Sequence, residues 1–477
     1  MSQTQIDSNM PDVIQGGMGI AVSTWQLAKE VSKAGGLGVV SATAIDSVIA
    51  RRLQDGDSSG EIRRAFSHFP NPEIAEEILH FYLNEGGRTT GAPYLDVPKL
   101  SLKPSKLTNN LLVLSAFTEV WLAKENNPGL IGINLLEKIQ LATPATLYGA
   151  MLAGVDYVLM GAGIPTEIPE LLRQLAENNA IKIGIDVSDA KNKYFLAFDP
   201  KQISQSLPKL NKPRFLAIIS SHALAAYLAK DEKTRPDGFV VEGATAGGHN
   251  APPRSKDAIG EDGQSKFTAL DDADLAKVAK TELPFWLAGG YGTPENLANA
   301  KALGAIGIQV GSLFALANES GFTREIKDEL LEQLTTDTLN VKTDPFASPT
   351  GFPFKIVEIE GTLSEASAFD DRARNCDLGY LRVPFERPQG GIGYRCPAEP
   401  IKTFEFKGGT SLHNSRSKCL CNALMADIGL GQLRVDGTVE LPLVTFGSDL
   451  AGAKELSKIH PDGWSAIQVM DFLHKTN

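Results

Sequence analysis

A glycine-rich loop that ends in a histidine carries the strongest chemical signal in the sequence. The segment Val240–His249 reads VVEGATAGGH, so an apolar run ends at Glu242 and opens into this loop. Glycines let the backbone approach a planar or phosphorylated ligand without a Cβ clash, and His249 can donate, accept or take up a proton near neutral pH. A tight turn with a surface histidine is the alternative interpretation. The candidate ligand-contacting glycines are Gly243, Gly247 and Gly248.

Two later segments have the composition of a phosphate site. They read LAGGYGTP at residues 287–294 and GIQVGS at residues 307–312, and each leads from an apolar run into glycine beside a hydroxyl or amide side chain. If these runs are the last two strands of a (β/α)8 barrel, their loops lie where such barrels often bind phosphate through backbone N–H groups. A pair of ordinary turns is the alternative. The candidate ligand-binding residues are Gly289, Gly290, Gln309, Gly311 and Ser312.

Two weaker signals also follow apolar runs. The segment Gln15–Gly19 reads QGGMG and includes Gly17 and Met18, although a methionine is more often a core residue than part of a ligand site. The segment Gly132–Asn134 reads GIN and ends in an amide that could hydrogen-bond the edge of a planar ring. An asparagine at the end of a strand is usually a turn residue, so neither signal is specific alone.

The elements that must position these residues are short apolar runs that alternate with helix-patterned stretches. Continuous apolar runs separated by helices predict a parallel sheet covered on both faces. Eight such strands fit a closed (β/α)8 TIM barrel, and an open doubly wound sheet is the alternative. The runs are Val13–Gln15, Gly38–Ser41, Ile131–Asn134, Tyr157–Met160, Phe215–Ser220, Gly238–Glu242, Phe285–Gly289 and Gly307–Val310.

Three stretches depart from this α/β repeat. Residues 60–128 have a mostly helical pattern and predict an insertion over the barrel mouth, and residues 181–200 alternate as in a β-hairpin insertion. After residue 320 the repeat stops. We therefore expect a barrel over residues 1–320 and an irregular C-terminal domain over residues 321–477 that packs on it.

The four cysteines of the chain all fall in this C-terminal region, with the spacing C-x19-C-x22-C-x-C. Thiols confined to a loop-rich domain are compatible with a structural zinc or an iron–sulfur site. The spacing matches no standard ligand pattern, so zinc is a tentative prediction and buried free thiols are the alternative. The residues are Cys376, Cys396, Cys419 and Cys421.

Composition and charge limit the classes of partner. The formal net charge of −11 argues against a general nucleic-acid-binding surface. No apolar run reaches the roughly 18 residues of a membrane span, and the polar N-terminus predicts no secretory signal. Few cysteines in a long chain favour a reducing cytoplasm. We expect a cytoplasmic protein with a small-molecule ligand. Composition and charge do not decide between a monomer and an oligomer.

Taken together, the spaced motifs resemble those of the nitronate monooxygenase family, formerly called 2-nitropropane dioxygenases. The matching segments are Gln15–Met18, Gly132–Asn134, Ala246–His249, Ala288–Tyr291 and Gly307–Ser312, and the resemblance covers about residues 11–320. It implies a barrel flavoprotein that binds FMN, with a histidine base in the A-G-G-H loop, here His249. The FMN contacts that it implies are Gly17, Met18, Asn134, Gly248, Gly289, Gly290, Gln309, Gly311 and Ser312.

The resemblance implies a monooxygenase that oxidises alkyl nitronates with O2. The chain departs from the family in two places. The family motif A-G-G-H often continues with x-G, whereas residues Asn250–Arg254 of this chain read NAPPR. The C-terminal region of this chain is also long. These departures leave a second function open, an FMN-dependent reductase of enoyl thioesters that uses NAD(P)H. A third alternative, of another class, is a non-catalytic barrel that binds a phosphorylated ligand.

Overall fold

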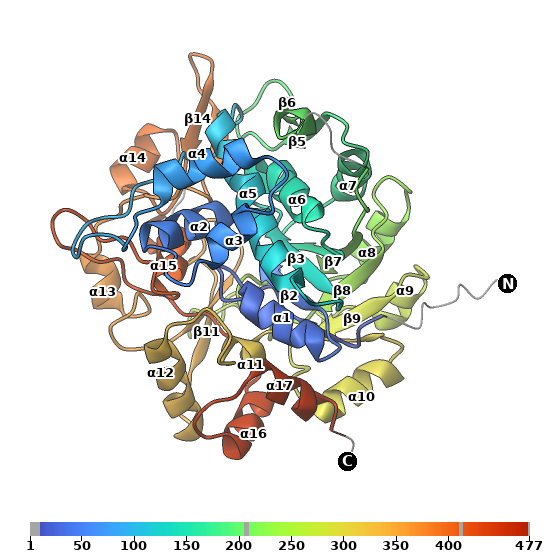
Figure 1. Ribbon diagram of the computed structural model, residues 1–477. Coiled ribbons are helices and arrows are strands. Elements are labelled where there is room, and N and C mark those ends of the chain that lie inside the picture. Colours follow the sequence, from blue (N-terminus) through green and yellow to red (C-terminus); the bar gives the residue numbers. More distant parts are fainter. Residues whose placement is uncertain (1–9, 205–208, 410–413, 476–477) are drawn as a thin grey trace.

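The centre of the molecule is a parallel β-barrel surrounded by helices (Figure 1). The computed structural model describes residues 10–204, 209–409 and 414–475. Its eight barrel strands follow one another in the order β1, β2, β3, β4, β7, β8, β9 and β10, each parallel to the next. The strands are β1 (Val13–Gln15), β2 (Gly38–Ser41), β3 (Ile131–Leu136), β4 (Tyr157–Gly161), β7 (Arg214–Ile219), β8 (Gly238–Glu242), β9 (Phe285–Ala288) and β10 (Gly307–Val310).

The first and second strands close the ring. Ile14 forms a parallel bridge with Leu37, the N–H of Gln15 donates to the carbonyl of Leu37 at 3.0 Å, and the N–H of Leu37 donates to Val13 at 2.9 Å. Closure excludes the open doubly wound sheet and confirms the predicted TIM barrel. The strands β1, β2 and β4 are buried along their whole length, because side chains fill the barrel on one face and helices cover the other.

Side chains fill the barrel interior on the side away from the strand ends that carry the predicted motifs. Trp286 of β9 is fully buried there, and its indole Nε1 donates to the carbonyl of Pro11 at 2.7 Å. The cavity that the predicted motifs line lies beyond this packed layer, at the C-terminal ends of the strands. The interior cluster consists of Ile14, Leu37, Val39, Tyr157, Leu159, Leu216, Val240, Trp286 and Ala288.

Helices cover the outside of the barrel, and α1, α5, α8, α9 and α10 begin with a side-chain N-cap. Thr293 caps α10 by accepting from the N–H of Asn296 at 3.2 Å, and Pro294 occupies the first turn, as its fixed φ favours. The helices are α1 (Trp25–Lys33), α2 (Ile45–Gln54), α5 (Lys106–Lys124), α6 (Thr143–Leu152), α7 (Ile168–Ala176), α8 (His222–Ala229), α9 (Leu275–Ala279), α10 (Pro294–Ala302) and α11 (Ser312–Ala315).

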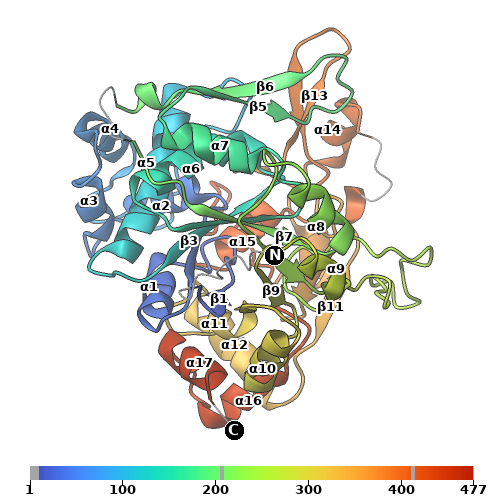
Figure 2. The same ribbon diagram turned by 90° about the vertical axis from the view of Figure 1, so that its right-hand side faces the viewer.

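Part of the predicted insertions belongs to the ring of helices around the barrel, and part lies outside the barrel repeat. The helices α3 (Glu61–Phe66) and α4 (Pro72–Tyr82) are additional, whereas α5 packs against α1 and α6 in the outer ring and not over the mouth. The hairpin of β5 (Ile181–Ile185) and β6 (Tyr194–Phe198) is antiparallel, as its alternating pattern predicts. Figure 2 shows this hairpin beside β13, where the N–H of Ser188 donates to Pro384 at 2.9 Å.

The C-terminal region is irregular and wraps the barrel. Its last helices lie beside α10, α11 and α12 in both views (Figures 1 and 2), and the indole of Trp464 donates to Leu313 at 2.8 Å. The elements are α12 (Arg324–Thr335), β11 (Val341–Asp344), β12 (Phe354–Val357), α13 (Ala366–Asp371), β13 (Val383–Glu386), β14 (Ile392–Arg395), α14 (Ile401–Phe406), α15 (Leu420–Ala426), α16 (Ala451–Ile459) and α17 (Ala466–Leu473).

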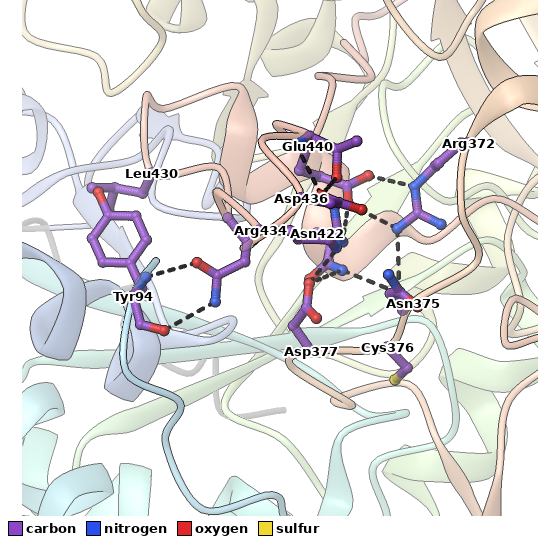
Figure 3. A network of polar contacts seen from close by, with 12 residues as sticks. Tyr94, Arg372, Asn375, Cys376, Asp377, Asn422, Leu430, Arg434, Asp436 and Glu440 are labelled. Atoms are coloured by element: carbon purple, nitrogen blue, oxygen red, sulfur yellow. Dashed lines mark hydrogen bonds and ion pairs between the residues drawn. The ribbon is translucent and has the colours of Figure 1, made fainter. Parts of the chain in front are cut away.

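A buried polar network compensates for the low content of regular structure in this region (Figure 3). Glu440 accepts from both Arg372 and Arg434, and Arg434 also pairs with Asp377 at 2.9 Å. Beside this network, the side-chain amide of Gln432 forms two hydrogen bonds with the backbone of Tyr94. The N–H of Tyr94 donates to Gln432 Oε1 at 2.8 Å, and Gln432 Nε2 donates to the carbonyl of Tyr94. Charge-assisted hydrogen bonds thus connect loops that have few ladder bonds.

Among the helices of the described ranges, none combines the length and the apolarity that a membrane span requires. Residues 1–9, on which the prediction of no secretory signal rests, lie outside the described residues.

We expect stability to depend on pH through Asp427. The residue is fully buried, one carboxyl oxygen accepts from Leu443 N–H at 3.0 Å, and burial raises its pKa to about 8 from the ordinary 3.8. Its contribution is therefore present below pH 4 and lost as pH rises to about 8. The free energy of unfolding, measured with urea, should fall between pH 5 and pH 8 in the parent. In Asp427→Asn this fall should be smaller by up to about 4 kcal/mol, at ~1.36 kcal/mol per pH unit. Equal drops would contradict the burial argument.

Candidate active site

A cavity of about 470 Å³ opens at the C-terminal ends of the barrel strands, and its volume is in the range of small-molecule sites. Loops that follow all eight barrel strands line it, together with residues of the C-terminal region. Gly243 is the exception among the predicted contacts, because it lies behind the wall with its N–H donated to Ala288 at 2.8 Å. The predicted residues that line the cavity are Gly17, Met18, Asn134, Gly247, Gly248, His249, Gly289, Gly290, Gln309, Gly311 and Ser312.

The loop after β1 is held by a buried glutamine. The side chain of Gln15 donates to Ser23 Oγ at 2.7 Å and accepts from Val39 N–H at 2.9 Å. This arrangement presses the loop backbone against β3, since a Cβ on Gly17 would lie 2.1 Å from Cβ of Asn134. Glycine is required here for backbone packing, a role that adds to the ligand contact predicted from the sequence.

The loops after β9 and β10 form a cradle of free backbone donors. Gly289 and Gly290 have φ of +79° and +77°, and a Cβ on Gly289 would lie 2.9 Å from the carbonyl oxygen of Gly243. Within the described part of the chain, the N–H groups of Gly290, Gly311 and Ser312 have no hydrogen-bond acceptor. Several unpaired N–H groups around one concavity make an anion site. The two segments that the sequence singled out therefore meet as predicted.

A C-terminal loop, residues 445–449, covers this cradle. Thr445 Oγ1 accepts from Gly248 N–H at 2.8 Å, Gly447 N–H donates to Ser312 Oγ at 3.0 Å, and Ser448 N–H donates to a carbonyl of the 245–248 loop at 2.9 Å. The hydroxyl of Ser312 is thus already engaged by the protein. Nothing in the local composition of residues 445–449 marks them as part of a site, so the sequence did not reveal this contact.

His249 is enclosed by side chains of the C-terminal region. Its Nε2 forms a hydrogen bond of 2.7 Å with Ser348 Oγ, and its ring meets the ring of Phe354 at 4.9 Å in an edge-on arrangement. Ser348 Oγ is itself 2.8 Å from Thr350 Oγ1. Burial lowers the pKa of His249 to about 4, so the imidazole is neutral at pH 7. Its Nδ1 has no partner among the residues described.

Glu242, at the end of β8, is a second ionisable group of the cavity wall. No hydrogen bond or ion pair holds its carboxyl within the described ranges, and burial raises its pKa to about 7, an effect that the attraction of Lys355 opposes. Lys355 of β12 is buried, with its Nζ donated to Thr343 Oγ1 at 2.7 Å. The sequence contains a signal for Glu242, since acidic residues at the C-terminal ends of barrel strands are often functional.

The family model described as nitronate monooxygenase matches residues 168–348 of the chain. The resemblance predicted from the motifs is confirmed. The matched segment contains the Glu242–His249 loop and both loops of the anion cradle, whereas Gly17 and Asn134 lie outside it.

Two curated relatives of this chain are also named as oxidoreductases. The 5-hydroxy-7a-methyl-1-oxo-octahydro-1H-indene-4-carboxyl-CoA dehydrogenase of Rhodococcus jostii is 29% identical over 169 residues, 33% of this chain and 43% of its own. A probable nitronate monooxygenase of Staphylococcus saprophyticus is 25% identical over 174 residues, 36% of this chain and 47% of its own. The chain thus spans less than half the length of these two relatives. Both names and the family description indicate an oxidoreductase.

Among solved structures, FabK from Thermotoga maritima is similar over 97% of this chain and 91% of its own, with 17% sequence identity and a TM-score of 0.48.

The tentative zinc site receives no support. Across the described residues no group of three or more His, Cys, Asp or Glu side chains could hold a metal ion, and the four cysteines are free thiols. Burial raises the pKa of each thiol, to about 11 for Cys419. The packing of the C-terminal region comes instead from apolar contacts and the network of Figure 3.

The flavin that the family resemblance implies fits this cavity. The free N–H groups of Gly290, Gly311 and Ser312 suit a phosphate, and the side-chain oxygen of Gln309, on the cavity wall, has no partner in the described part of the chain. At Gly248, where φ is +75°, a Cβ would meet no atom within 4 Å, so the loop leaves room for a planar group. These donors and this amide would suit a flavin that carries a phosphate.

Proposed function

We propose that this protein is an FMN-dependent oxidoreductase that oxidises alkyl nitronates or their parent nitroalkanes with O2. The observation that carries the proposal is the meeting, in one cavity, of an anion cradle with proton-active side chains, Glu242 and His249. When bound, the flavin supplies the two-electron chemistry. The chain's own residues hold the phosphate, exclude water and move a proton at the reacting carbon.

The shape of the cavity supports a small carbon acid as substrate. Apolar side chains from the ends of β3 and β7 form one wall, and Phe352 and Phe354 of the C-terminal region stand beside His249. An apolar enclosure lowers the local dielectric and strengthens every charge interaction within it. The wall residues of the barrel are Leu135, Leu136, Ile139, Ile218, Ile219 and Leu224.

A second candidate function is the reduction of an enoyl thioester by NAD(P)H. The cavity also reaches an apolar region of the C-terminal domain formed by Leu381, Leu420 and Leu424, which would suit an acyl chain. The curated relative from Rhodococcus jostii is itself named for an acyl-CoA substrate. The third alternative, a non-catalytic phospholigand-binding barrel, would need neither proton-active group. We further propose a cytoplasmic setting, consistent with four free thiols.

The purified protein should be yellow and should release non-covalent FMN on heating. FMN and not FAD is expected because the anion cradle provides for one phosphate and no adenylate-binding motif is present in the sequence. Chromatography of the heat-released flavin checks the result. Recovery of FAD, or no flavin after expression with riboflavin, would contradict the proposal, and the latter would favour the non-catalytic barrel.

Anaerobic spectra of the same holoprotein then separate the two enzymatic candidates. Bleaching of the flavin band by a nitronate but not by NAD(P)H supports the first function. Bleaching by NAD(P)H, with reoxidation by an enoyl thioester, supports the second. These spectra use the whole chain and need no variant.

A further inference from the structure

The imidazole of His249 is held in place by a segment of the C-terminal region. Residues His249 and Phe354 form an antiparallel bridge, and Lys355 N–H donates to the carbonyl of Gly248 at 3.0 Å. The ring of Phe354 meets the imidazole edge-on at 4.9 Å. Because the backbone and the ring are both fixed, each nitrogen of the imidazole has constant surroundings.

The two nitrogens of this imidazole have different surroundings. Nε2 forms a hydrogen bond of 2.7 Å with Ser348 Oγ, and Ser348 is only 3% exposed and does not line the cavity. Nδ1 has no partner among the residues described, and it is open to molecules of the size of water. Because His249 itself lines the cavity, Nδ1 is the nitrogen that a bound substrate can reach.

The hydroxyl of Ser348 has three hydrogen-bond partners. It accepts from Thr350 N–H at 3.2 Å, and it lies 2.8 Å from Thr350 Oγ1 and 2.7 Å from His249 Nε2. A serine hydroxyl has one proton and two lone pairs, so one lone pair and the proton remain for the last two partners. Either the proton goes to Thr350 and Nε2–H donates to Ser348, or both directions are reversed.

We propose that Ser348 is a positioning residue that keeps the proton of His249 on Nε2 and leaves Nδ1 as the atom that accepts the substrate proton. This inference rests on the proposed function. In the step, Nδ1 forms an N–H bond with the α-proton while the C–H bond breaks. The C–H electron pair becomes the carbon–nitrogen double bond of the nitronate, whose oxygens take the negative charge, and the proton later leaves Nδ1 to solvent.

The direction of the bond to Ser348 follows from the charge that the ring must carry. When Nδ1 takes up a proton, both ring nitrogens bear hydrogen and Nε2 can only donate. With Nε2–H already donated to Ser348, this change needs no rotation of the hydroxyl, and the serine oxygen faces the developing positive charge. The reverse arrangement would present an N–H group to the cavity, and that group cannot accept a proton.

The place of Ser348 is set within the C-terminal region. Asp344 Oδ1 accepts from Phe346 N–H at 2.8 Å and from Ala347 N–H at 3.2 Å. The N–H of Lys418 donates to the carbonyl of Ala347 at 2.8 Å. None of these bonds involves the hydroxyl of Ser348, so its removal should leave the segment in place. A side chain from outside the barrel thus orients the histidine of a barrel loop.

Anaerobic flavin reduction by a neutral nitroalkane measures the role of Ser348. Ser348→Ala should retain FMN and slow this reduction by about ten- to a hundredfold, because a misaligned reacting group can cost about 10²-fold. The pre-formed nitronate needs no deprotonation, so its rate should change by less than about threefold. Ser348→Thr retains a hydroxyl and should recover part of the rate. His249→Asn removes the base and should slow the neutral substrate by at least about a hundredfold.

The matched control is Ser457→Ala. Ser457, in α16, is also 3% exposed, its hydroxyl donates to the carbonyl of Lys454 at 3.0 Å, and it does not line the cavity. The variant removes a buried serine hydroxyl of the same region without touching His249, so it should change the rate with neither substrate.

The 15N NMR spectrum of the holoprotein, labelled at its histidines, gives a readout independent of turnover. The chain has seven histidines, and the signals missing from His249→Asn belong to residue 249. We expect the proton on Nε2 in the parent and exchange between both tautomers in Ser348→Ala. In Thr350→Val the hydroxyl of Ser348 loses an acceptor and is free to donate to Nε2, so the fraction with the proton on Nδ1 should rise.

The outcomes separate this inference from the proposed function. If the parent reacts but Ser348→Ala keeps the parental rate with the neutral nitroalkane, or slows the nitronate to the same extent, Ser348 does not position the base. A proton on Nδ1 in the parent spectrum would also overturn the assignment. If no nitroalkane reduces the flavin of the parent, the proposed function fails and the proton-accepting role of Nδ1 fails with it. The NMR spectra then still decide whether Ser348 fixes the tautomer of His249.

Discussion

Gly290→Asp should leave the protein without FMN. Gly290 lies in the anion cradle with φ of +77°, and a Cβ there would lie 3.1 Å from both Asp449 Oδ2 and Thr245 Oγ1. The new carboxylate would oppose both Asp449 and the flavin phosphate. Two unit charges about 4 Å apart repel by roughly 4 kcal/mol at an effective dielectric near 20, which corresponds to about a thousandfold weaker binding. Flavin content per chain, from the visible spectrum, measures the effect.

Gly290→Asn is the matched control for this substitution. It has nearly the same size as aspartate and tolerates a positive φ better than most side chains, but it brings no charge. We expect partial FMN occupancy in Gly290→Asn and almost none in Gly290→Asp. Normal FMN content in the aspartate variant would show that the phosphate binds elsewhere. Equal loss in both variants would show that steric strain, and not charge, decides binding.

The sequence was sufficient to predict the barrel because each strand leaves a local mark. Runs such as Gly38–Ser41 and Gly238–Glu242 are apolar throughout most of their length, and the structure has strands with those bounds. The β5–β6 hairpin was recognisable by its alternation, and it lies outside the barrel as predicted. The place of α5 was not recognisable, since a mostly buried helix shows little amphipathic pattern to indicate which neighbours it packs against.

The candidate site could be predicted only on its barrel side. Glycines at strand ends, such as Gly289 and Gly311, stand beside their apolar runs in the sequence and meet at one cavity. The C-terminal contribution comes from distant residues that carry no motif: Ser348 bonds a histidine 99 positions earlier, and Thr445 bonds a glycine 197 positions earlier. Long-range contacts of this kind depend on how an irregular chain folds back, which hydrophobic periodicity does not encode.

The tentative zinc prediction receives no support from the described residues, and the structure shows how the region packs without a metal. Confinement of four cysteines to one region suggests that the region needs a metal, but the region is stabilised by other means. Glu440 with Arg372 and Arg434, and an apolar layer around α15 to α17, provide the packing. Three of the cysteines are buried as small apolar side chains, a common role for free thiols in cores.

Residues of the C-terminal region line part of the cavity. The variant Gly452→Ala tests whether this region also contributes to FMN binding. Gly452, in the first turn of α16, is buried against the loop after β9, and a Cβ would lie 1.9 Å from the carbonyl oxygen of Gly292. Because both contacting groups are backbone, α16 or the cradle must move. We expect a loss of at least about 1–3 kcal/mol of stability in urea unfolding, and weaker FMN binding because Gly290 shares the displaced loop. Gly292→Ala is the control, since its Cβ would meet Leu313 at an ordinary 3.7 Å, and it should unfold at the parental urea concentration. If Gly452→Ala binds FMN with parental affinity, this contact of α16 contributes to stability and not to FMN binding.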